Sequence, residues 1–524
     1  MTPERSDPQV LKAICEQGYA LHRAGRFDEA ERCYDRVLKR NPKHFAALHL
    51  LGVVRVQTGR AEQAVELLRR AAKINPDDPA VQDNLGAALC ETGRPEAALA
   101  NHERALALKP DFADAHYNRG VALDRLKRPE EALASYDAAI AQAPGHVRAH
   151  HNRGTALDIL GRTQEALASY DRAIALKPDY AEAFANRGQV LGDLGRLGEA
   201  LASFNAAITL DPGFAYARAC KSLVLLRTGQ FEAGWREYEW RKANWDAAKR
   251  LDPGRAWSGE GELAGKRLFL HCEQGLGDSL QCARYVPLLA DRGAEITLYT
   301  QSSLVSLLGA SLPGVSVAAE GGPPPDFDFH CSLMSLPLAF ETRLETIPPP
   351  LRLRSGERRP KFADRFGPKS RPRIGLAWSG NPTHVNDRNR SIAFDRLAPL
   401  LGEEIEWIAL QNEIRPRDSA AFAASGRVTF LGDALNDFAD TAALVEQMDL
   451  VITVDTSLAH LAGSLGKPTW ILLPFAPDWR WLLDRADSPW YPTARLFRQP
   501  AIGDWDSVIA EVQAALRSTV GCSA

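Results

Sequence analysis

Several features that mark specialised protein classes are missing from this sequence. Its 8 cysteines are scattered and form no C-x-x-C pair, which argues against a structural zinc site or a disulfide framework and indicates a reducing compartment. No apolar run approaches the roughly 18 residues of a membrane span, and the first residues, MTPERSDPQV, lack the apolar core of a signal peptide. A formal net charge of -3 gives no electrostatic attraction to nucleic acid or to a membrane surface. These absences predict a cytoplasmic protein with neither a membrane span nor a nucleic-acid partner.

The first feature that is present is a repeat of 34 residues. Its prolines stand at Pro42, Pro76, Pro110, Pro144, Pro178 and Pro212, and its first glycines at Gly18, Gly52, Gly86, Gly120, Gly154 and Gly188. A second glycine follows in every unit except one, where Lys127 takes its place, and alanines keep the same step from Ala30 to Ala200. Such a period predicts stacked helix pairs. The first glycine and the alanine let the two helices approach closely, and the second glycine ends the first helix.

The period and its marker residues resemble the tetratricopeptide repeat (TPR), with six clear units and a degenerate seventh over residues 1–244. In the seventh unit Ser222 replaces the first glycine, and the second helix gains Trp235, Tyr238 and Trp240. A terminal repeat has to face something other than another repeat. These aromatic residues therefore either cover the end of the array or dock on the next domain, and docking is the favoured interpretation.

An asparagine recurs two residues before the first glycine, at Asn84, Asn118, Asn152 and Asn186. In the resembled fold this position faces the concave groove, and an amide offers both a donor and an acceptor. The row is similar to the asparagine ladder in the TPR part of O-linked N-acetylglucosamine transferase. That similarity implies that the groove holds an extended polypeptide by its backbone. The alternative is that asparagine is simply common at this place in the repeat.

After a linker at residues 245–261 the helical period stops, and short apolar strands alternate with helices. The predicted strands are RLFLHC, EITLYT, RIGLAW, EWIAL, VTFL, LVITV and TWILL. A break at residues 346–372 is rich in proline and arginine, and its arginines either attract phosphate or solvate a linker. The predicted fold class is α + α/β, an all-α TPR superhelix followed by two Rossmann-like halves at residues 262–345 and 373–524.

The stretch EQGLGDS stands at the carboxyl end of the first predicted strand, where ligands of parallel α/β sheets bind. Gly275 and Gly277 allow a tight turn and the close approach of a substrate. Asp278 stands near the start of a helix expected from about Ser279 to Asp291. The dinucleotide fingerprint is incomplete because its third glycine is missing, so nicotinamide binding is not expected. Asp278 with Gln281 also fits a capping box, so this acid is a candidate catalytic base or a helix cap.

The stretch VITVDTSLAHL carries a second group of polar residues at a strand end. Asp455, Thr456 and Ser457 open a helix, and His460 lies one turn further in. The free N–H groups of a helix start favour anions, and hydroxyls beside them suit a phosphate. The same hydroxyls also fit plain helix caps.

The stretch WSGNPTHVNDRNRSI forms a polar loop after the strand RIGLAW. It contains Asn381, Arg388 and Arg390, and arginine there can neutralise a phosphate. Trp479 and Trp481 follow the last predicted strand. They either stack on a base or sugar, or pack inside the domain.

Together, EQGLGDSLQ, RNRSI and DTSLAHLAGSLGKP resemble the heptosyltransferase-like (family 9) glycosyltransferases of the GT-B fold. The resemblance implies that Asp278 is the catalytic base on an acceptor hydroxyl and that Arg390 contacts the donor phosphate. It also implies that the nucleotide-sugar is held by Asp455, Thr456 and His460. The layout of a TPR array before such a domain is similar to that of bacterial TPR-linked transferases that modify flagellin.

The sequence therefore predicts a glycosyltransferase that moves a sugar from a nucleotide-sugar donor to a Ser or Thr hydroxyl of a protein. The acceptor, for which a flagellin-like protein is one candidate, is expected in the TPR groove. Neither a metal nor a bound cofactor is expected, because no carboxylate pair demands a metal and donor charge can be stabilised by protein groups. Two alternatives stay open: a non-catalytic TPR scaffold with a sugar- or nucleotide-sensing domain, and a lipopolysaccharide-directed transferase.

Overall fold

The structure, a computed structural model, describes residues 7–244, 251–358, 360–363, 365–366, 369–384 and 386–520. The chain divides into two compact units, Met1–Leu191 with Thr209–Asp211, and Gly192–Ile208 with Pro212–Ala524. The seventh helix pair thus belongs to the same compact unit as the α/β region. The boundaries proposed from the sequence for the domains and linkers stay predictions, and part of both linkers lies outside the described residues.

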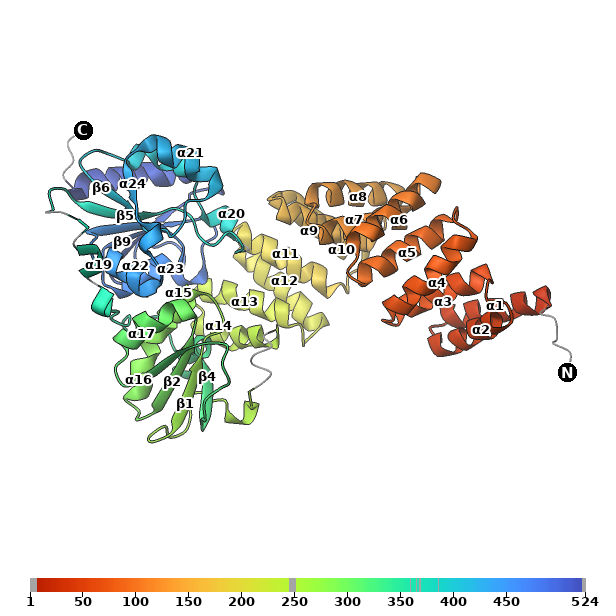
Figure 1. Cartoon of the computed structure of the whole chain (residues 1–524), viewed down its shortest axis with the longest axis horizontal. Coiled ribbons are helices and arrows are strands. Elements are labelled where there is room, and N and C mark those ends of the chain that lie inside the picture. Colours follow the sequence, from red (N-terminus) through yellow and green to blue (C-terminus); the bar gives the residue numbers. More distant parts are fainter. Residues whose placement is uncertain are drawn as a thin grey trace. The chain divides into compact units, whose positions relative to one another are not determined.

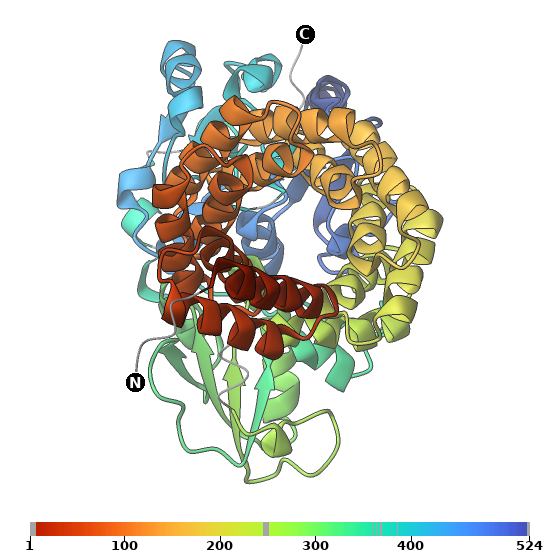
Figure 2. The ribbon, with the colours of Figure 1, turned by 90° about the vertical axis from the view of Figure 1, so that its right-hand side faces the viewer.

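Each unit of the 34-residue repeat folds into a pair of helices. The first four pairs are α1 (Pro8–Arg23) and α2 (Phe27–Arg40), α3 (Phe45–Gln57) and α4 (Ala61–Ile74), α5 (Pro79–Glu91) and α6 (Pro95–Leu108), and α7 (Ala113–Arg125) and α8 (Pro129–Gln142). The next three are α9 (Val147–Ile159) and α10 (Thr163–Leu176), α11 (Ala181–Asp193) and α12 (Leu197–Leu210), and α13 (Ala215–Arg227) and α14 (Phe231–Tyr238). Figure 2 shows the pairs of the first unit winding around a common axis, as stacked TPR units do.

The marker residues of the repeat perform the packing roles predicted for them. A Cβ added at Gly18 would lie 2.8 Å from the Tyr34 ring, so only glycine lets α1 and α2 approach this closely. Ala30 on α2 is fully buried, as its small side chain predicts. Gly25 has a φ of 73°, the left-handed conformation that ends the first helix. Lys127 adopts the same conformation, with a φ of 57°, where the repeat has lost its glycine.

The α/β region contains two fully parallel sheets (Figure 1). The four-stranded sheet has the order β3-β2-β1-β4, with β1 (Arg267–His271), β2 (Glu295–Thr300), β3 (Ser316–Ala319) and β4 (Phe329–Ser332). The six-stranded sheet has the order β10-β9-β8-β5-β6-β7, with β5 (Arg373–Ala377), β6 (Glu406–Ala409), β7 (Val428–Phe430), β8 (Leu450–Val454), β9 (Thr469–Leu473) and β10 (Ala494–Arg498). This confirms the predicted fold class of stacked TPR helices followed by two Rossmann-like halves.

Helices connect the strands on both sheets. In the first half they are α15 (Leu276–Cys282), α16 (Val286–Ala290), α17 (Val305–Ser311) and α18 (Leu336–Ala339). In the second half they are α20 (Asp387–Arg390), α21 (Pro416–Ser425), α22 (Phe438–Val445), α23 (Ser457–Ser464) and α24 (Trp505–Val520), and α19 (Pro360–Ala363) lies between the sheets in sequence. Both sheets share the order 3-2-1-4 in chain sequence. The order therefore reverses next to β1 in one sheet and next to β5 in the other. Ligands of doubly wound folds bind at such reversal points, outside the carboxyl ends of the strands.

The helix after β1 begins earlier than the sequence predicted. It starts at Leu276 rather than Ser279. After a 3-10 turn at Ala283–Tyr285 the helix resumes as α16 and ends at Ala290, one residue before the predicted end. Gly275 is the N-cap residue, so Asp278 occupies the third helical position rather than the cap. The predicted capping box of Asp278 with Gln281 is therefore displaced by one turn.

The seventh helix pair docks on the α/β region, as the sequence analysis favoured. Trp235 is buried, and its indole N–H donates to the carbonyl oxygen of Thr342 at 2.9 Å. The Tyr238 hydroxyl donates to the Gln274 side chain at 3.0 Å, in the loop that follows β1. One apolar core contains side chains of both regions. A search of the described residues for a helix with the length and apolarity of a membrane span found none.

Candidate functional site

Ionisable side chains from both halves of the α/β region meet at the carboxyl ends of their strands. We call this group the carboxyl-edge cluster; its members are Asp278, Arg390, Asp455, His460, Asp478 and Arg480. Four of these residues were candidates from sequence, and the structure brings them together. Asp478 and Arg480 were missed. Both follow β9, in the same stretch as Trp479 and Trp481. Their position after a strand is the one feature of the sequence that indicates a site there.

Asp278 is held by two hydrogen-bonding groups. One carboxylate oxygen accepts the Gly275 N–H at 2.8 Å, which caps α15, and the other pairs with the guanidinium of Arg480. The side chain is 19% exposed. Burial raises the pKa of Asp278, whereas Arg480 lowers it and Asp478 raises it further. The sequence offered a helix cap or a catalytic base for Asp278. The carboxylate does cap its helix, and it also stands in a charged cluster, where its role as a base stays a prediction.

Arg480 bridges the two halves of the α/β region. Its guanidinium contacts Asp278 and the Gln281 side-chain oxygen, both on α15, and pairs with Asp478 at 2.7 Å. The side chain is 8% exposed. Burial alone would lower the pKa of Arg480, but the two carboxylates raise it overall, so the group stays cationic.

The segment around the start of α23 has the predicted position at the end of β8. Thr456 is the N-cap, and its hydroxyl accepts the Leu458 N–H at 3.3 Å, so the capping role is present. Asp455 precedes it, and burial, with a further contribution from Asp478, raises the pKa of Asp455 to about 6. Ser457 is half-buried at the first helical position. At this helix start Thr456 accepts the N–H groups of Leu458 and Ala459, and a carboxyl with a raised pKa stands beside them.

His460 is buried beneath this helix start rather than displayed at it. Its Nδ1 lies 2.9 Å from the Tyr491 hydroxyl, and its ring stacks on Trp481. Burial lowers the pKa of His460 well below its ordinary value, so the ring is neutral. A Cβ added at Gly277 would lie 2.6 Å from the His460 ring. Gly277 therefore allows α15 and α23 to approach, while its predicted contact with a donor stays a prediction.

The loop after β5 places Arg390 against the same edge. Its guanidinium donates to the Asp455 carbonyl oxygen at 2.9 Å, and it crosses over Gly380. Arg388 is exposed on α20. Asn381 is also exposed and closes a local turn by accepting the Thr383 N–H at 3.0 Å. Of the three loop candidates, only Arg390 joins the carboxyl-edge cluster.

A buried ion pair that the sequence analysis missed fixes this loop. Asp387 receives two hydrogen bonds from Arg415, at 2.8 and 3.0 Å, and one from the Ser391 hydroxyl at 2.6 Å. The partners lie 28 residues apart, so no local pattern announces the pair. The pair ties α20 to the start of α21, and Arg390 is the last residue of α20.

The two tryptophans proposed as stacking groups are buried. Trp479 is 2% exposed and packs edge-on against Trp235 of the seventh helix pair, with ring centroids 5.1 Å apart. Trp481 is fully buried beside His460. This burial favours packing, the alternative weighed from sequence, over stacking on a base or sugar.

The asparagine row links neighbouring repeats. Each amide nitrogen contacts a side chain 35 residues earlier in the chain. The pairs are Asn84 with His49 at 2.8 Å, Asn118 with Asp83 at 3.0 Å, Asn152 with Tyr117 at 3.4 Å, and Asn186 with His151 at 3.0 Å. All four asparagines are half-buried. The amides therefore serve the stacking of repeats, which fits the alternative that asparagine is common at this place in the repeat, while their contact with a bound polypeptide stays a prediction.

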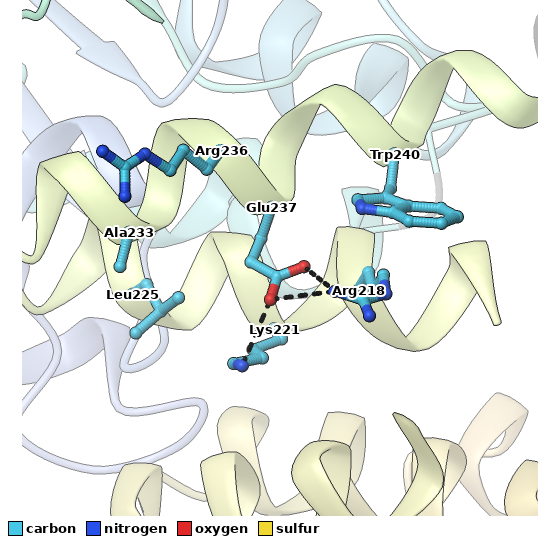
Figure 3. Close-up of a pocket in the computed structure, with 7 residues that line it drawn as sticks. All are labelled: Arg218, Lys221, Leu225, Ala233, Arg236, Glu237 and Trp240. Carbon is cyan, nitrogen blue, oxygen red and sulfur yellow. Dashed lines mark hydrogen bonds and ion pairs between the residues drawn. The ribbon is translucent and has the colours of Figure 1, made fainter. Parts of the chain in front are cut away.

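A separate pocket of about 340 Å³ lies on the seventh helix pair (Figure 3). Arg218 and Lys221 of α13 both pair with Glu237, at 2.9 and 3.3 Å, and the Arg218 guanidinium lies over the Trp240 ring. Glu237 is the only acid among the lining residues and faces two cations, so the pocket keeps a net positive charge. None of the carboxyl-edge cluster lines it, so it is a surface feature distinct from the candidate site.

The fold and the site define a class: a TPR array followed by an α/β region with two parallel sheets. Models described as tetratricopeptide or TPR repeats match residues 15–79, 84–147, 159–195 and 181–214. The matched segments lie in the helical array, and they confirm that it consists of TPR repeats.

One curated protein and several solved structures are similar to the chain. Protein FlbA of Caulobacter vibrioides is 28% identical over 330 residues, which cover 57% of this chain and 54% of FlbA. The chain thus spans about half the length of this distant relative. MamA is 27% identical over 34% of this chain and 96% of its own, with a TM-score of 0.29. The Thermus thermophilus TPR protein TTC0263 is 27% identical over 35% and 99%, with a TM-score of 0.31.

Proposed function

We propose that this protein is a glycosyltransferase that transfers a sugar from a nucleotide-sugar to a hydroxyl of a polypeptide. The observation that carries the proposal is the convergence of Asp278, Arg390, Asp455 and Arg480 at the reversal points of two parallel sheets. Such points are where doubly wound folds bind nucleotides. The resemblance of the same three stretches to family 9 glycosyltransferases gives the reaction class.

In the proposed reaction Asp278 removes the proton from the acceptor hydroxyl. The hydroxyl oxygen forms a bond to the anomeric carbon while the bond from that carbon to the diphosphate oxygen breaks. The electron pair of the broken bond leaves with the nucleoside diphosphate. Arg390 and the N–H groups at the start of α23 stabilise the charge on this leaving group. The proton ends on the Asp278 carboxylate.

The TPR array supplies the acceptor in this proposal. Stacked TPR helices form extended concave surfaces for polypeptides, and the half-buried asparagines keep amide oxygens that can accept backbone N–H groups. The resemblance to TPR-linked transferases makes flagellin the first acceptor to test.

One observation favours a second candidate, a scaffold whose α/β region senses a nucleotide or sugar. Asp278, the proposed base, already has both oxygens engaged, by Gly275 and by Arg480. Glu273, another acid of the same loop, is paired with Arg241 and the Ser332 hydroxyl and is 2% exposed. A sensor would bind the donor at this edge and transfer nothing.

Two measurements on the full chain decide between the candidates. Calorimetric titration with a panel of nucleoside diphosphates tests donor binding, and intact mass spectrometry of flagellin, from cells with and without this gene, tests transfer. A transferase binds one nucleotide and increases the flagellin mass by one or more sugars. Binding without any mass change identifies the sensor, and a mass change confined to lipopolysaccharide would contradict the protein acceptor.

A further inference from the structure

The carboxylate that the proposed reaction needs as a base is occupied in this structure. One Asp278 oxygen accepts the Gly275 N–H at 2.8 Å, and the other pairs with Arg480. A carboxylate paired with a guanidinium is a weaker base than a free one, because the cation stabilises its ionised form. A base in this arrangement has to be released before it can accept the proton of a hydroxyl.

Arg480 has the geometry to make that release depend on a ligand. Its guanidinium is shared between carboxylates from two elements, Asp278 on α15 and Asp478 after β9. The positive charge of Arg480 also lowers the pKa of Asp455, the residue before the N-cap of α23. A planar guanidinium offers several donors and binds phosphate oxygens as readily as carboxylates. An anion at the start of α23 would therefore compete with Asp278 for Arg480.

We propose that Arg480 is a positioning residue that holds Asp278 in the free protein and releases it when the diphosphate of a nucleotide donor takes the guanidinium. This inference rests on the proposed function. It adds that donor binding itself switches on the base, so that Asp278 becomes strongly basic only when a sugar is present to transfer.

Release of Asp278 changes the number of protons that the protein binds. With Arg480 removed, burial and Asp478 act on Asp278 without an opposing cation, so the pKa of Asp278 rises on binding. Between its free and bound pKa values the complex holds more protons than the free protein. Nucleotide affinity therefore increases as pH falls through this window, by at most about tenfold per pH unit for one coupled proton.

Other groups near Asp278 have to be separated from this signal. The titratable and charged groups that face it from the surrounding elements are Arg480, Asp478, Tyr238, Cys282, His384 and His460. Asp455 titrates as well, because its pKa is raised to about 6. The signal is therefore the difference between the wild-type chain and Asp278→Asn, which keeps every other group.

The experiment is calorimetry of the full chain with UDP, GDP, ADP, CDP and TDP across about pH 5 to 8, in buffers of different protonation enthalpy. We expect the wild-type chain to take up protons on binding its nucleotide. Both Asp278→Asn and Arg480→Gln should lose this uptake, the first because the titrating group is gone and the second because Asp278 is already released. Arg485→Gln is the matched control, since Arg485 lies in the same loop but pairs with Asp487.

Each outcome bears on the inference. Proton uptake in Arg480→Gln equal to that of the wild type would overturn it, since the nucleotide would then act on Asp278 directly. If Arg480→Gln does not fold, equal uptake in Asp278→Asn and the wild type still overturns it. Nucleotide binding without coupled protons defeats this inference and leaves the proposed function standing. Failure of every nucleotide to bind the folded chain defeats both.

Discussion

At the scale of single residues, the candidate site was only partly predictable from the sequence. Asp278 and the segment from Asp455 to His460 were found because each stands just after an apolar strand, where parallel sheets bind ligands. Arg390 was found in the polar loop that follows another strand. Arg480 was missed because its partner lies 202 residues away. No local pattern records a pair that only the folded chain creates.

Asp278→Asn tests the base directly. Turnover should fall about 100- to 10,000-fold, the range for a positioned base. The melting temperature should fall as well, because the pair with Arg480 is lost, although Asp478 still neutralises the guanidinium; the cost is about 1–3 kcal/mol. Steady-state kinetics and thermal unfolding check these outcomes. The control is Asp487→Asn, an exposed acid of the loop after β9, and unchanged turnover in Asp278→Asn would remove this residue from the mechanism.

Lys127→Gly should stabilise the array. Lys127 has a left-handed φ of 57°, at a position where the other repeats have glycine. The left-handed conformation costs a residue other than glycine about 1–2 kcal/mol. Part of that gain is offset by the greater freedom of glycine in the unfolded chain, so a net gain of up to about 1 kcal/mol is expected. Thermal unfolding followed by circular dichroism measures it. Lys109→Gly, at an extended C-cap with a φ of -141°, should lower stability instead; a gain there equal to that of Lys127→Gly would contradict the backbone argument.

At the scale of helices and strands, the predictions held where the pattern was long or strongly apolar. The helix pairs follow from the glycine, alanine and proline of the 34-residue repeat, and the seven predicted strands are all present. Six of them contain buried residues, whereas β7 has three residues and none is buried. β3, β4 and β10 were not predicted. β3 and β4 have four residues each, and β3 has no buried residue, so the apolar pattern that marks a central strand is absent from it. β10 has five residues, but arginines interrupt its apolar run.

The asparagine row is expected to affect both acceptor capture and the stability of the array. Changing Asn118, Asn152 and Asn186 together to alanine should weaken acceptor capture. It should also lower stability by about 1 kcal/mol for each lost hydrogen bond, because the amides contact the preceding repeat, as Asn118 does with Asp83. Pull-down of flagellin by the folded variant separates the two effects. The matched control is Asn101→Ala, whose amide donates to the Ala97 carbonyl oxygen of its own helix. If the triple variant captures flagellin as well as the wild type does, the asparagines contribute to the stacking of repeats and not to acceptor binding.

At the scale of the whole molecule, the seventh helix pair determines where the chain can be divided. Trp235 and Tyr238 bond to the α/β region, and Arg241 neutralises the buried Glu273. A fragment of residues 251–524 loses these partners and leaves a buried carboxylate unpaired, at a cost of about 3–5 kcal/mol. A fragment of residues 192–524 keeps them.

We therefore expect the longer fragment to unfold cooperatively and the shorter one to lack fixed tertiary structure. Near-ultraviolet circular dichroism and thermal unfolding of both fragments check this. A cooperative transition in the 251–524 fragment, at the temperature of the longer one, would show that the docked helices are dispensable.

The repeat also constrains how this protein can change over evolutionary time. In the pairs from α1 to α10, the first glycine meets a side chain of the second helix at the same place in the repeat. Duplication or loss of a 34-residue gene segment there therefore leaves equivalent pairs side by side. The seventh pair is different, because its tryptophan, tyrosine and arginine are matched to particular atoms outside the array. Gene duplication can therefore alter the reach of the array freely at its amino-terminal end. Descendants of this gene should vary in repeat number while keeping the last pair unchanged.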